Sequence, residues 1–520
     1  MIRLLETTIA AVSPGWAAKR SADRLRYYAL NNYTGQGGGY AYQAADPRAR
    51  TPVRWLAANG TADNLLIPSL PVLIARSRDA LRNHPAYQGA IAGRTANVVG
   101  TGIGVEADSG DDSLDELLTD GFESWAESAS VDGRSLWELQ DIAYRERLVV
   151  GGFLWRWVVD GERAARGLIP DCLLELDVEW LSQVPLEPIP KDCRFAGGIT
   201  FDKFKRPKRY HLRNPDIIQG VPGEVVDADQ IIHGYKVTRP GQTRGEPEGS
   251  ASLLWLWNGH SLIEAELRAA VTGAAPSVVV KASDGGASMG IGTGANAASP
   301  GVSTGGSASA IPALGPTLPS GAVAGLFPGE SIEVVENKRP SQQIFPFLKS
   351  MWGVVAGAFG IGRRWIDRDA SDASYSSQRA DQQDTRRQLE PDQYHFGRHV
   401  ALLVYRRIAP LVAAAAGRPL PANPVRRERL LRAHIQPDGW PYVNPLEDIQ
   451  AQILAVASGF STYNDEVTKR GGSLRRMWRQ AAKDRDLATK MDLHFDLSGK
   501  TAPTTLADAS QNTQPKPQAA

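Results

Sequence analysis

The sequence has 520 residues, of which 42% are hydrophobic and 22% charged, and its formal net charge at pH 7 is +1. This length predicts two to four domains with hydrophobic cores of their own. A net charge near zero argues against a protein that coats nucleic acid, and two cysteines, Cys172 and Cys193, are too few for a disulfide framework.

Residues 1–70 are predicted to form an irregular arm, because Arg, Tyr, Gly and Pro are mixed there with weak periodicity. The first residues, MIRLLETTIAAV, carry Glu6 among apolar residues and lack the apolar run of a signal peptide. No apolar run elsewhere reaches membrane length. We therefore expect neither secretion nor membrane insertion.

A mixed α/β domain is predicted over residues 71–240. Its first helix ends near Asn83–Pro85, and a second helix leads through Gly100–Gly104 into a strand. Two helices and an alternating strand, FLWRWVV, follow, with a turn at Asp160–Gly161. The helices are expected at Leu114–Trp125 and Leu136–Val149, and further strands at Leu173–Leu176, Gly198–Phe201, Tyr210–Arg213 and Gln230–Lys236.

Two amphipathic helices are predicted to pair, one over Ser250–Ala275 and one between Gln342 and Ile361. Two short strands lie between them and flank residues 285–325, which contain no charged residue and are rich in Gly, Ala and Ser. The apolar residues expected on these helices include Leu253, Trp257, Leu267, Phe347, Met351 and Val355.

The segment RRWIDRDASDASY, residues 363–375, has no periodicity and is predicted to be an exposed loop. Its three arginines and three aspartates nearly balance. By itself the segment fits a dimerisation hairpin, an enzyme lid or a loop that points into a channel. The candidate site residues are Arg363, Arg364, Trp365, Ile366, Asp367, Arg368, Asp369 and Tyr375.

The remaining chain is predicted to be helical. A helix capped by Ser376 or Ser377 runs to Leu389, Pro391 breaks it, and a further helix covers Gln393–Ala416. PLEDIQAQILAVASG, from Pro445, reads as a helix stopped by Gly459, with Ser461 or Thr462 capping the next and an Arg- and Lys-rich helix after it. Residues 498–520 have the composition of a disordered tail.

No catalytic, metal or cofactor site is expected. The single GK[ST] sequence, at Gly499, would place the first glycine of a phosphate-binding loop at His494. GTGIGV, from Gly100, follows a helix and precedes a strand, the reverse of the order in a dinucleotide site. His233 and Arg244 lack a nearby nucleophile or carboxylate base and are expected to order a turn.

Several phrases, in this order, resemble lambda-family portal proteins of tailed bacteriophages. They are ARSRDALRNHP and NVVGTGI, IIHGYKVTRPGQTRGEPEGS, GIGRRWIDRD with SYSSQRA, and DGWPYVNPLEDIQ followed by STYNDEVTKRGG. The resemblance covers about residues 10–490.

The resemblance implies a mixed α+β portal fold with an α/β wing, a helical stem, a small clip and a helical crown. It divides the chain into an N-terminal arm (1–70), wing (71–240), first stem helix (241–275), clip (276–341), second stem helix (342–361), tunnel loop (362–376), long connecting helices (377–435), crown (436–497) and tail (498–520).

The function implied is that of a homo-oligomer, a dodecamer in this family, at one capsid vertex of the virion. Double-stranded DNA would pass through it transiently during packaging and ejection, with arginines of the tunnel loop touching phosphates. The implied partners are the terminase large subunit, head–tail connector proteins and the major capsid or scaffold protein, with assembly in the host cytoplasm. The rival interpretation is a DNA-binding or hydrolytic phage enzyme on a related scaffold.

Overall fold

The structure is a computed structural model that describes residues 59–213, 223–274, 277–282, 330–335, 344–369, 371, 374–440 and 444–492. The expected tail and the Gly/Ala/Ser-rich stretch lie outside these residues, as does nearly all of the expected arm. None of the described helices combines the length and apolar character needed to cross a bilayer.

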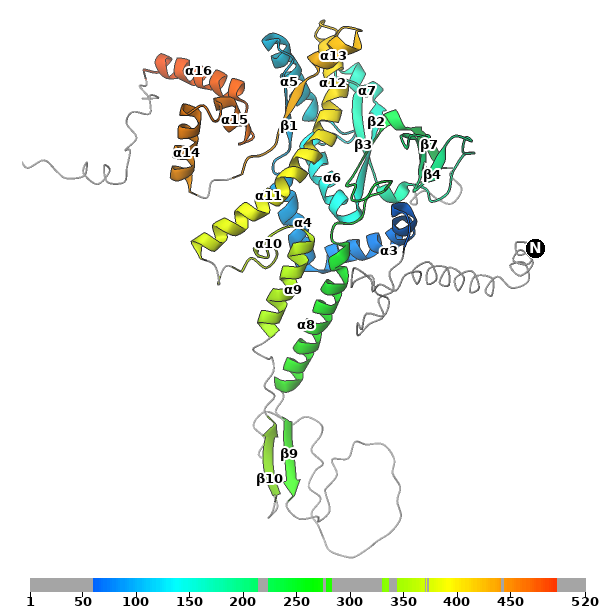
Figure 1. The fold of residues 1–520 in the computed structure, drawn as a ribbon, viewed down its shortest axis with the longest axis vertical. Coiled ribbons are helices and arrows are strands. Elements are labelled where there is room, and N and C mark those ends of the chain that lie inside the picture. Colours follow the sequence, from blue (N-terminus) through cyan, green and yellow to red (C-terminus); the bar gives the residue numbers. More distant parts are fainter. Residues whose placement is uncertain are drawn as a thin grey trace, which may run out of the picture. The chain divides into compact units, whose positions relative to one another are not determined.

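The first described helix, α3 (Ala62–Asn83), begins inside the stretch expected to be irregular. Thr61 caps it by accepting a hydrogen bond from the Asn64 amide, and the helix continues through Pro68 and Pro71. His84 separates it from α4 (Pro85–Val98), as the sequence predicted (Figure 1). Regular secondary structure therefore begins at Ala62, before residue 70, where the arm was expected to end.

Seven more elements follow, and the five of them that the sequence predicted, two helices and three strands, come in the predicted order. The capping side chains are Asp111 for α5 and Ser135, within a capping box, for α6. One expectation was wrong, because the turn at Asp160–Gly161 opens a short helix instead. The elements are β1 (Gly104–Ala107), α5 (Asp112–Ala126), α6 (Leu136–Val150), β2 (Gly152–Val159), α7 (Gly161–Ala165), β3 (Asp171–Leu176) and the 3₁₀ turn Val178–Trp180.

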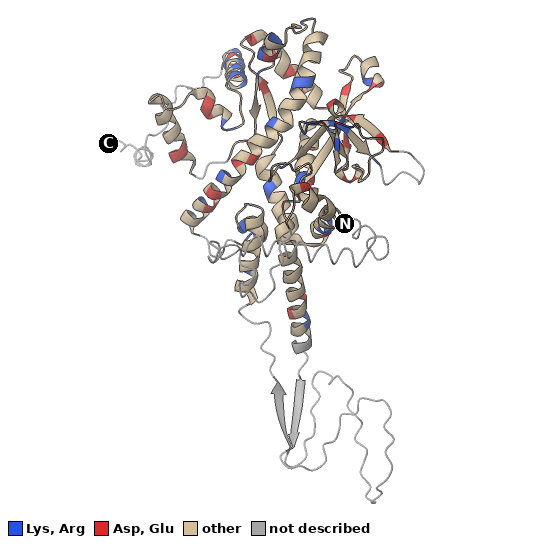
Figure 2. Ribbon diagram, turned by 45° about the vertical axis from the view of Figure 1, so that its right-hand side comes forward, with Lys and Arg blue, Asp and Glu red and all other residues tan. Residues whose placement is uncertain are grey.

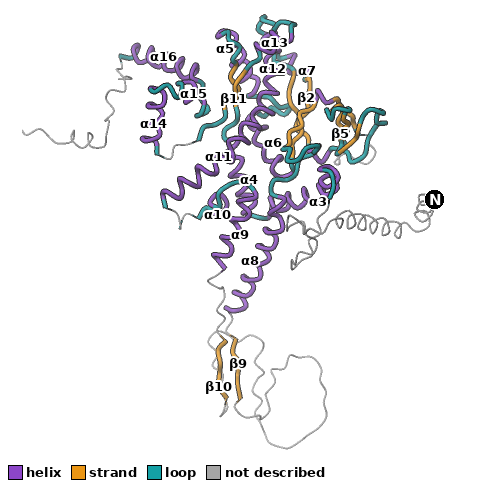
Figure 3. The backbone as a smooth tube through the Cα atoms, in the orientation of Figure 1, coloured by secondary structure: helices purple, strands orange, loops and turns teal. Residues whose placement is uncertain are grey.

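Two antiparallel sheets complete the mixed α+β architecture. One has the strand order β3–β2–β8, and the other β4–β5–β6–β7. Figure 3 draws their strands in orange, with β2 of the first sheet and β5 of the second labelled. Strands β4 and β7, which are three and four residues long, were not predicted. The remaining bounds are β4 (Arg194–Ala196), β5 (Ile199–Phe201), β6 (Pro207–Leu212), β7 (Glu224–Asp227), the 3₁₀ turn Ala228–Gln230 and β8 (Ile231–Tyr235).

Helices α8 (Leu253–Ala274), preceded by the 3₁₀ turn Ser250–Ser252, and α9 (Ile344–Ala358) pack together as predicted. Gly259 lets them approach, since a Cβ there would lie 2.8 Å from Met351 Cε. Strands β9 (Ser277–Ala282) and β10 (Glu330–Val335) pair antiparallel between the two helices in sequence, as expected.

The apolar residues predicted for this helix pair have two different environments. Leu253, Met351 and Val355 are buried. Trp257, Leu267 and Phe347 are 65%, 60% and 52% exposed, so they do not belong to the packing face within one chain.

Helix α11 (Tyr375–His399) departs from the prediction at both ends. Ser374, not Ser376 or Ser377, is its N-cap, and the helix continues through Pro391 instead of breaking there. The change of direction comes at Val400, before α12 (Ala401–Ala415). Helix α12 packs on α5, where Tyr405 meets Phe122 edge-on.

The C-terminal part contains one strand that the sequence did not predict. After α13 (Pro424–Leu430), β11 (Ala433–Gln436) pairs antiparallel with β1, with Ile435 opposite Val105. Three helices follow: α14 (Pro445–Ala457), α15 (Tyr463–Thr468) and α16 (Leu474–Lys490). Gly459, with a φ of 74°, stops α14, and Thr462 caps α15, both as predicted.

Candidate functional site

The candidate site is the crossing from α9 to α11, residues 359–374. Gly360, with a φ of 61°, ends α9, while the Ile361 amide donates to Ala356 O and the Gly360 amide to Gly357 O. These two hydrogen bonds form a Schellman motif, which fixes the direction in which the chain leaves the helix. Gly362 then crosses α11 closely, and its amide donates to Thr385 Oγ1 at 3.2 Å.

The first part of this segment is not the exposed loop that the sequence predicted. Residues Arg364–Asp367 form a short helix, α10, that packs on α4. The Trp365 indole lies 3.5 Å from the position that a Cβ on Gly93 would take, and Ile366 backbone covers Gly89. Trp365 and Ile366 are partly buried by this contact. Burial of apolar side chains is favourable, so the segment folds back onto α4.

The charged residues of the segment are largely engaged. Arg363 pairs with Asp367 at 2.5 Å, and Lys349 of α9 pairs with Asp369 at 2.7 Å. The hydrogen bond from Lys349 holds the pKa of Asp369 well below its ordinary value, with help from Ser371. Arg364 is half-buried and reaches Ser377 Oγ at 3.4 Å.

Arg368 is the exposed cation of the segment. Its backbone has a φ of 53°, which is unusual for a residue with a side chain, and no ion pair to it is found among the described residues. Asp372 and the side chain of Tyr375, the latter expected to belong to the site, lie outside what the structure describes.

Below this segment, a buried polar network joins five parts of the chain. Arg94 of α4 donates to Phe359 O at 2.8 Å, to Glu248 Oε1 at 2.9 Å and to Asp392 Oδ2 at 2.9 Å. Tyr144 donates to Asp392 at 2.6 Å, and Arg147 does so at 2.5 Å. The network thus ties the end of α9 and the approach to α8 to α4, α6 and α11.

The network is ionised despite its burial. Burial alone would raise the pKa of Asp392, but Arg147 and Arg94 outweigh it and hold the pKa well below its ordinary value. The pKa of Glu248 is lowered in the same way: burial opposes ionisation, and Arg94 and Lys236 favour it. The carboxylates are therefore charged and paired at neutral pH.

Sequence reasoning missed this network. Arg94 is the only charged residue between Pro85 and Val105, and a lone charge in an apolar helix signals a buried partner. Asp392 follows a proline that should have ended its helix. Neither signal identifies the partner, because the contacting residues are up to 298 positions apart.

Trp365 also lines a cavity of about 380 Å³ between α11 and the C-terminal helices. The indole nitrogen of Trp440 is buried at this cavity without a hydrogen-bond partner among the described residues. Arg386 lies over the Trp440 ring at 5.8 Å and pairs with Glu390 at 2.7 Å. The cavity thus links the candidate site to α14 and to residues 469–470.

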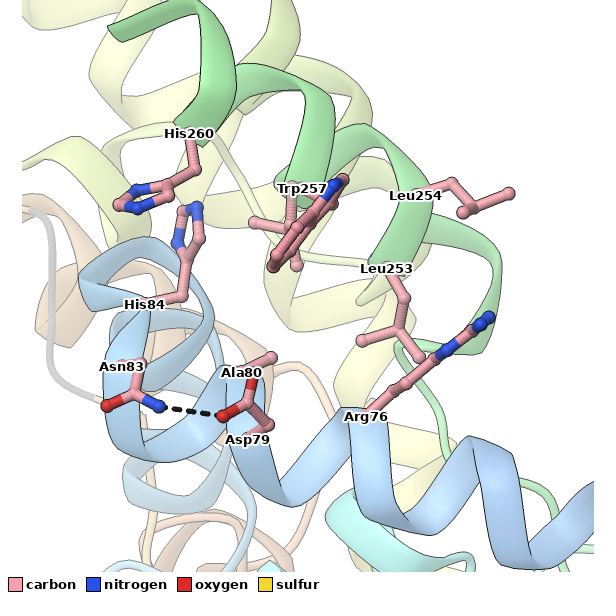
Figure 4. A pocket seen from close by; sticks show the side chains of 10 residues that line it. Arg76, Asp79, Ala80, Asn83, His84, Leu253, Leu254, Trp257 and His260 are labelled. Carbon is pink, nitrogen blue, oxygen red and sulfur yellow. Dashed lines mark hydrogen bonds between the residues drawn. The ribbon is translucent and has the colours of Figure 1, made fainter. Parts of the chain in front are cut away.

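A larger cavity, of about 550 Å³, lies between α3 and α8 (Figure 4). Leu253 and Trp257 of α8 face it, with Arg76 at its edge. His84 and His260 meet there with ring centroids 6.0 Å apart, and burial together with the neighbouring His260 lowers the pKa of His84. Part of its apolar lining, Leu254 and Trp257, stays exposed in a single chain.

The other charged candidates are structural, as the sequence suggested. His233 is buried, which lowers its pKa to about 3, and Arg244 donates to Gly197 O and Val178 O. Burial likewise lowers the pKa of Arg244 to about 10. Within the described ranges, no group of three or more His, Cys, Asp or Glu is arranged to hold a metal ion.

Comparison with known proteins agrees with the resemblance seen in the sequence. The model of the family described as phage portal protein, lambda family, matches residues 48–393. No curated protein matches the chain.

Three solved structures are similar to the chain, each at 14% identity. The neck of an empty GTA particle with C6 symmetry has a TM-score of 0.41, with 77% of this chain and 93% of that chain covered. The neck of a native GTA particle with C12 symmetry has 0.40, with 78% and 99% covered. The virion of a native gene transfer agent particle has 0.37, with 78% and 99% covered.

The family match spans more than half of the sequence and includes the α8–α9 pair, the segment that follows it and most of the buried network. The chain therefore belongs to the lambda family of phage portal proteins, whose general role is in the packaging of DNA.

Proposed function

We propose that copies of this chain form a closed ring, of twelve subunits in the expected case, through which double-stranded DNA passes. The observation that carries this proposal is the position of residues 359–374. The segment leaves the end of the α8–α9 pair in a fixed direction, is anchored on α4 by Trp365, and presents Arg368 to solvent.

The α8–α9 pair supports assembly because its apolar surface exceeds what one chain covers. On α8, Trp257 is 65% exposed and Leu254 66% exposed; on α9, Phe345 is 64% exposed. Apolar patches of this kind mark surfaces that bind a partner. In a ring, α8 of one copy and α9 of the next would cover each other. A closed symmetric assembly then leaves neither face exposed.

The proposed DNA contact is made by Arg368. Of the three arginines that the sequence suggested for this contact, Arg363 pairs with Asp367, Arg364 is half-buried and Arg368 is exposed, so we assign the contact to one guanidinium per subunit. A ring repeats that charge once per copy, which attracts phosphates while each individual contact remains weak. Weak contacts let DNA slide, whereas tight ion pairs would retain it.

The remaining partners follow from family membership. We infer that the ring sits at one capsid vertex of the virion and contacts the major capsid or scaffold protein during assembly in the host cytoplasm. The part of the chain that contains β9 and β10 would dock the terminase large subunit and later the head–tail connector proteins. ATP hydrolysis would be supplied by the terminase, so the chain itself is not an enzyme.

Electron microscopy of the purified full-length protein tests the proposal. We expect rings with a central hole wide enough for double-stranded DNA and no intrinsic ATPase activity in the same preparation. Monomers or dimers that hydrolyse ATP or cut DNA would support the rival enzyme interpretation instead.

A further inference from the structure

The three C-terminal helices, α14–α16, lack a core of their own. None of them contains a buried residue in the described part of the chain. Nevertheless they carry large apolar side chains, which we call the C-terminal apolar surface. It consists of Leu446, Ile449, Ile453 and Leu454 on α14, Phe460 and Tyr463 at the start of α15, and Met477 and Trp478 on α16.

Helix α16 is docked by its charged face. Its arginines pair with acidic residues of α5: Arg475 with Asp115 at 2.9 Å, and Arg479 with Glu116 at 2.8 Å. Figure 2 colours the ribbon blue at Lys and Arg and red at Asp and Glu. A surface helix of a globular protein normally buries its apolar face, so here the usual orientation is reversed.

The apolar face of α16 therefore points away from α5. Trp478 is 57% exposed and Met477 48% exposed, although each could be buried if another helix packed there. Exposed pairs such as Arg479 with Glu116 stabilise little because both side chains stay hydrated, so they orient α16 more than they hold it.

Helix α14 offers a matching surface. Leu446, Ile449 and Ile453 recur at spacings of three and four residues and are 54%, 40% and 64% exposed, which makes one apolar stripe. The only charged residues of α14 are Glu447 and Asp448.

The charges of the two helices are complementary. Beyond the arginines that contact α5, α16 carries Lys483, Arg485 and Lys490 against Asp484 and Asp486. An acidic helix and a basic helix, each with an uncovered apolar stripe, fit each other, yet both stripes stay exposed within one chain. The stripe of α14 can therefore be covered by α16 of a second copy, and the stripe of α16 by α14 of a second copy.

We propose that the C-terminal apolar surface is an interface between copies of this chain, in which α14 of one copy packs against α16 of a second copy. The interface is heterologous, because two different surfaces meet, and such contacts form a ring when the rotation from one copy to the next closes. This inference rests on the proposed ring. It adds a second contact between subunits, independent of the one at α8 and α9.

Zero-length carbodiimide cross-linking on mixed rings tests the interface. Rings are assembled from equal amounts of light and heavy-isotope subunits, and carboxylates of Glu447 or Asp448 are joined to Lys483 or Lys490. We expect cross-linked peptides that contain one light and one heavy partner. Cross-links found only within one isotope class would overturn the inference, because they would join helices of a single chain.

Substitutions give the second readout. Ile453→Glu and Trp478→Glu should each remove the mixed cross-links and lower the temperature at which rings dissociate, while Val425→Glu on α13, 75% exposed outside this surface, should change neither. Truncation after Asp492 should leave the mixed cross-links intact; their loss would assign the surface to residues 493–520. If the wild-type chain forms no rings at all, the proposed function itself fails.

Discussion

At the scale of single residues, burial decides which charges matter. Asp392 is surrounded by Arg94, Arg147 and Tyr144, and none of these side chains can find water if the carboxylate is lost. Asp141 pairs with Arg145 one turn away on the surface of α6, where both remain hydrated. The same type of ion pair therefore has different consequences at the two places.

Asp392→Asn should destabilise the chain by about 3–5 kcal/mol, because it leaves the buried Arg147 without its charge partner and removes one of the two carboxylates that pair with Arg94. Asp141→Asn is the matched control and should cost about 0.5 kcal/mol or less. Denaturant unfolding of both variants measures the difference. Equal midpoints for the two variants would show that the network does not stabilise the fold.

The same residue predicts a pH dependence. The pKa of Asp392 is depressed in the folded chain, so its contribution to stability is complete above the unfolded value of about 3.9 and is lost as the pH falls towards the folded value. Thermal unfolding of the wild type should therefore shift to lower temperature below about pH 4. Asp392→Asn should flatten this dependence; a parallel pH profile in the variant would contradict it.

Arg368 allows a test of the DNA contact without disturbing the fold, since it is exposed and has no ion pair among the described residues. Arg368→Ala removes one phosphate contact, so the slope of log affinity against log salt concentration should fall by about 1 for each arginine in contact with DNA. Arg426→Ala, on the exposed α13, is the control and should leave the slope unchanged. Binding of linear duplex DNA to purified rings at several salt concentrations measures it.

At the scale of elements, the sequence predicts what local chemistry determines. The helix boundary at His84, the stop at Gly459 and the cap at Thr462 each follow from the residue at that position. Where the structure departs from these local predictions, contacts with residues distant in the sequence are the cause. Pro391 stays within α11, where the next residue is held by Arg94 and Arg147, and this outweighs the local cost of about 3 kcal/mol.

In the candidate site, too, some features follow from the local sequence and others from distant contacts. The sequence shows two apolar side chains, Trp365 and Ile366, within a charged segment, and such side chains need a surface to cover. That this surface is α4, and that Arg363 pairs within its own helical turn, depends on how the chain folds back. Periodicity carries no information on such a contact.

The junction between α9 and the candidate site can be tested with two glycines, Gly353 within α9 and Gly360 just after its end. Gly360→Ala places a side chain at a φ of 61° and should cost about 1–2 kcal/mol. Gly353→Ala, where an added Cβ meets nothing within 4 Å, should stabilise by about 0.5–1 kcal/mol. Denaturant unfolding measures both, and a destabilised Gly353→Ala would show that this face of α9 is covered.

At the scale of the whole molecule, polar and apolar contacts have separate roles. The Arg94 network fixes α9 and the approach to α8 on the rest of one chain, so the helix pair is held before any partner arrives. The large apolar side chains that remain exposed on α8 and α9 contribute little to a lone subunit. Their burial becomes favourable only when copies meet, which separates folding from assembly.

Trp257→Glu tests this separation. The side chain is 65% exposed at the edge of the cavity between α3 and α8, so the single chain should unfold at nearly the wild-type denaturant concentration. Assembly should weaken, because a buried interface tryptophan typically contributes about 2 kcal/mol or more, roughly thirtyfold in the dissociation constant of each contact. Val425→Glu, on α13, is the matched control. Sedimentation velocity over a range of protein concentrations should show rings for the control and the wild type, and mainly small species for Trp257→Glu. Rings of unchanged stability would mean that this face of α8 does not contact a neighbouring copy.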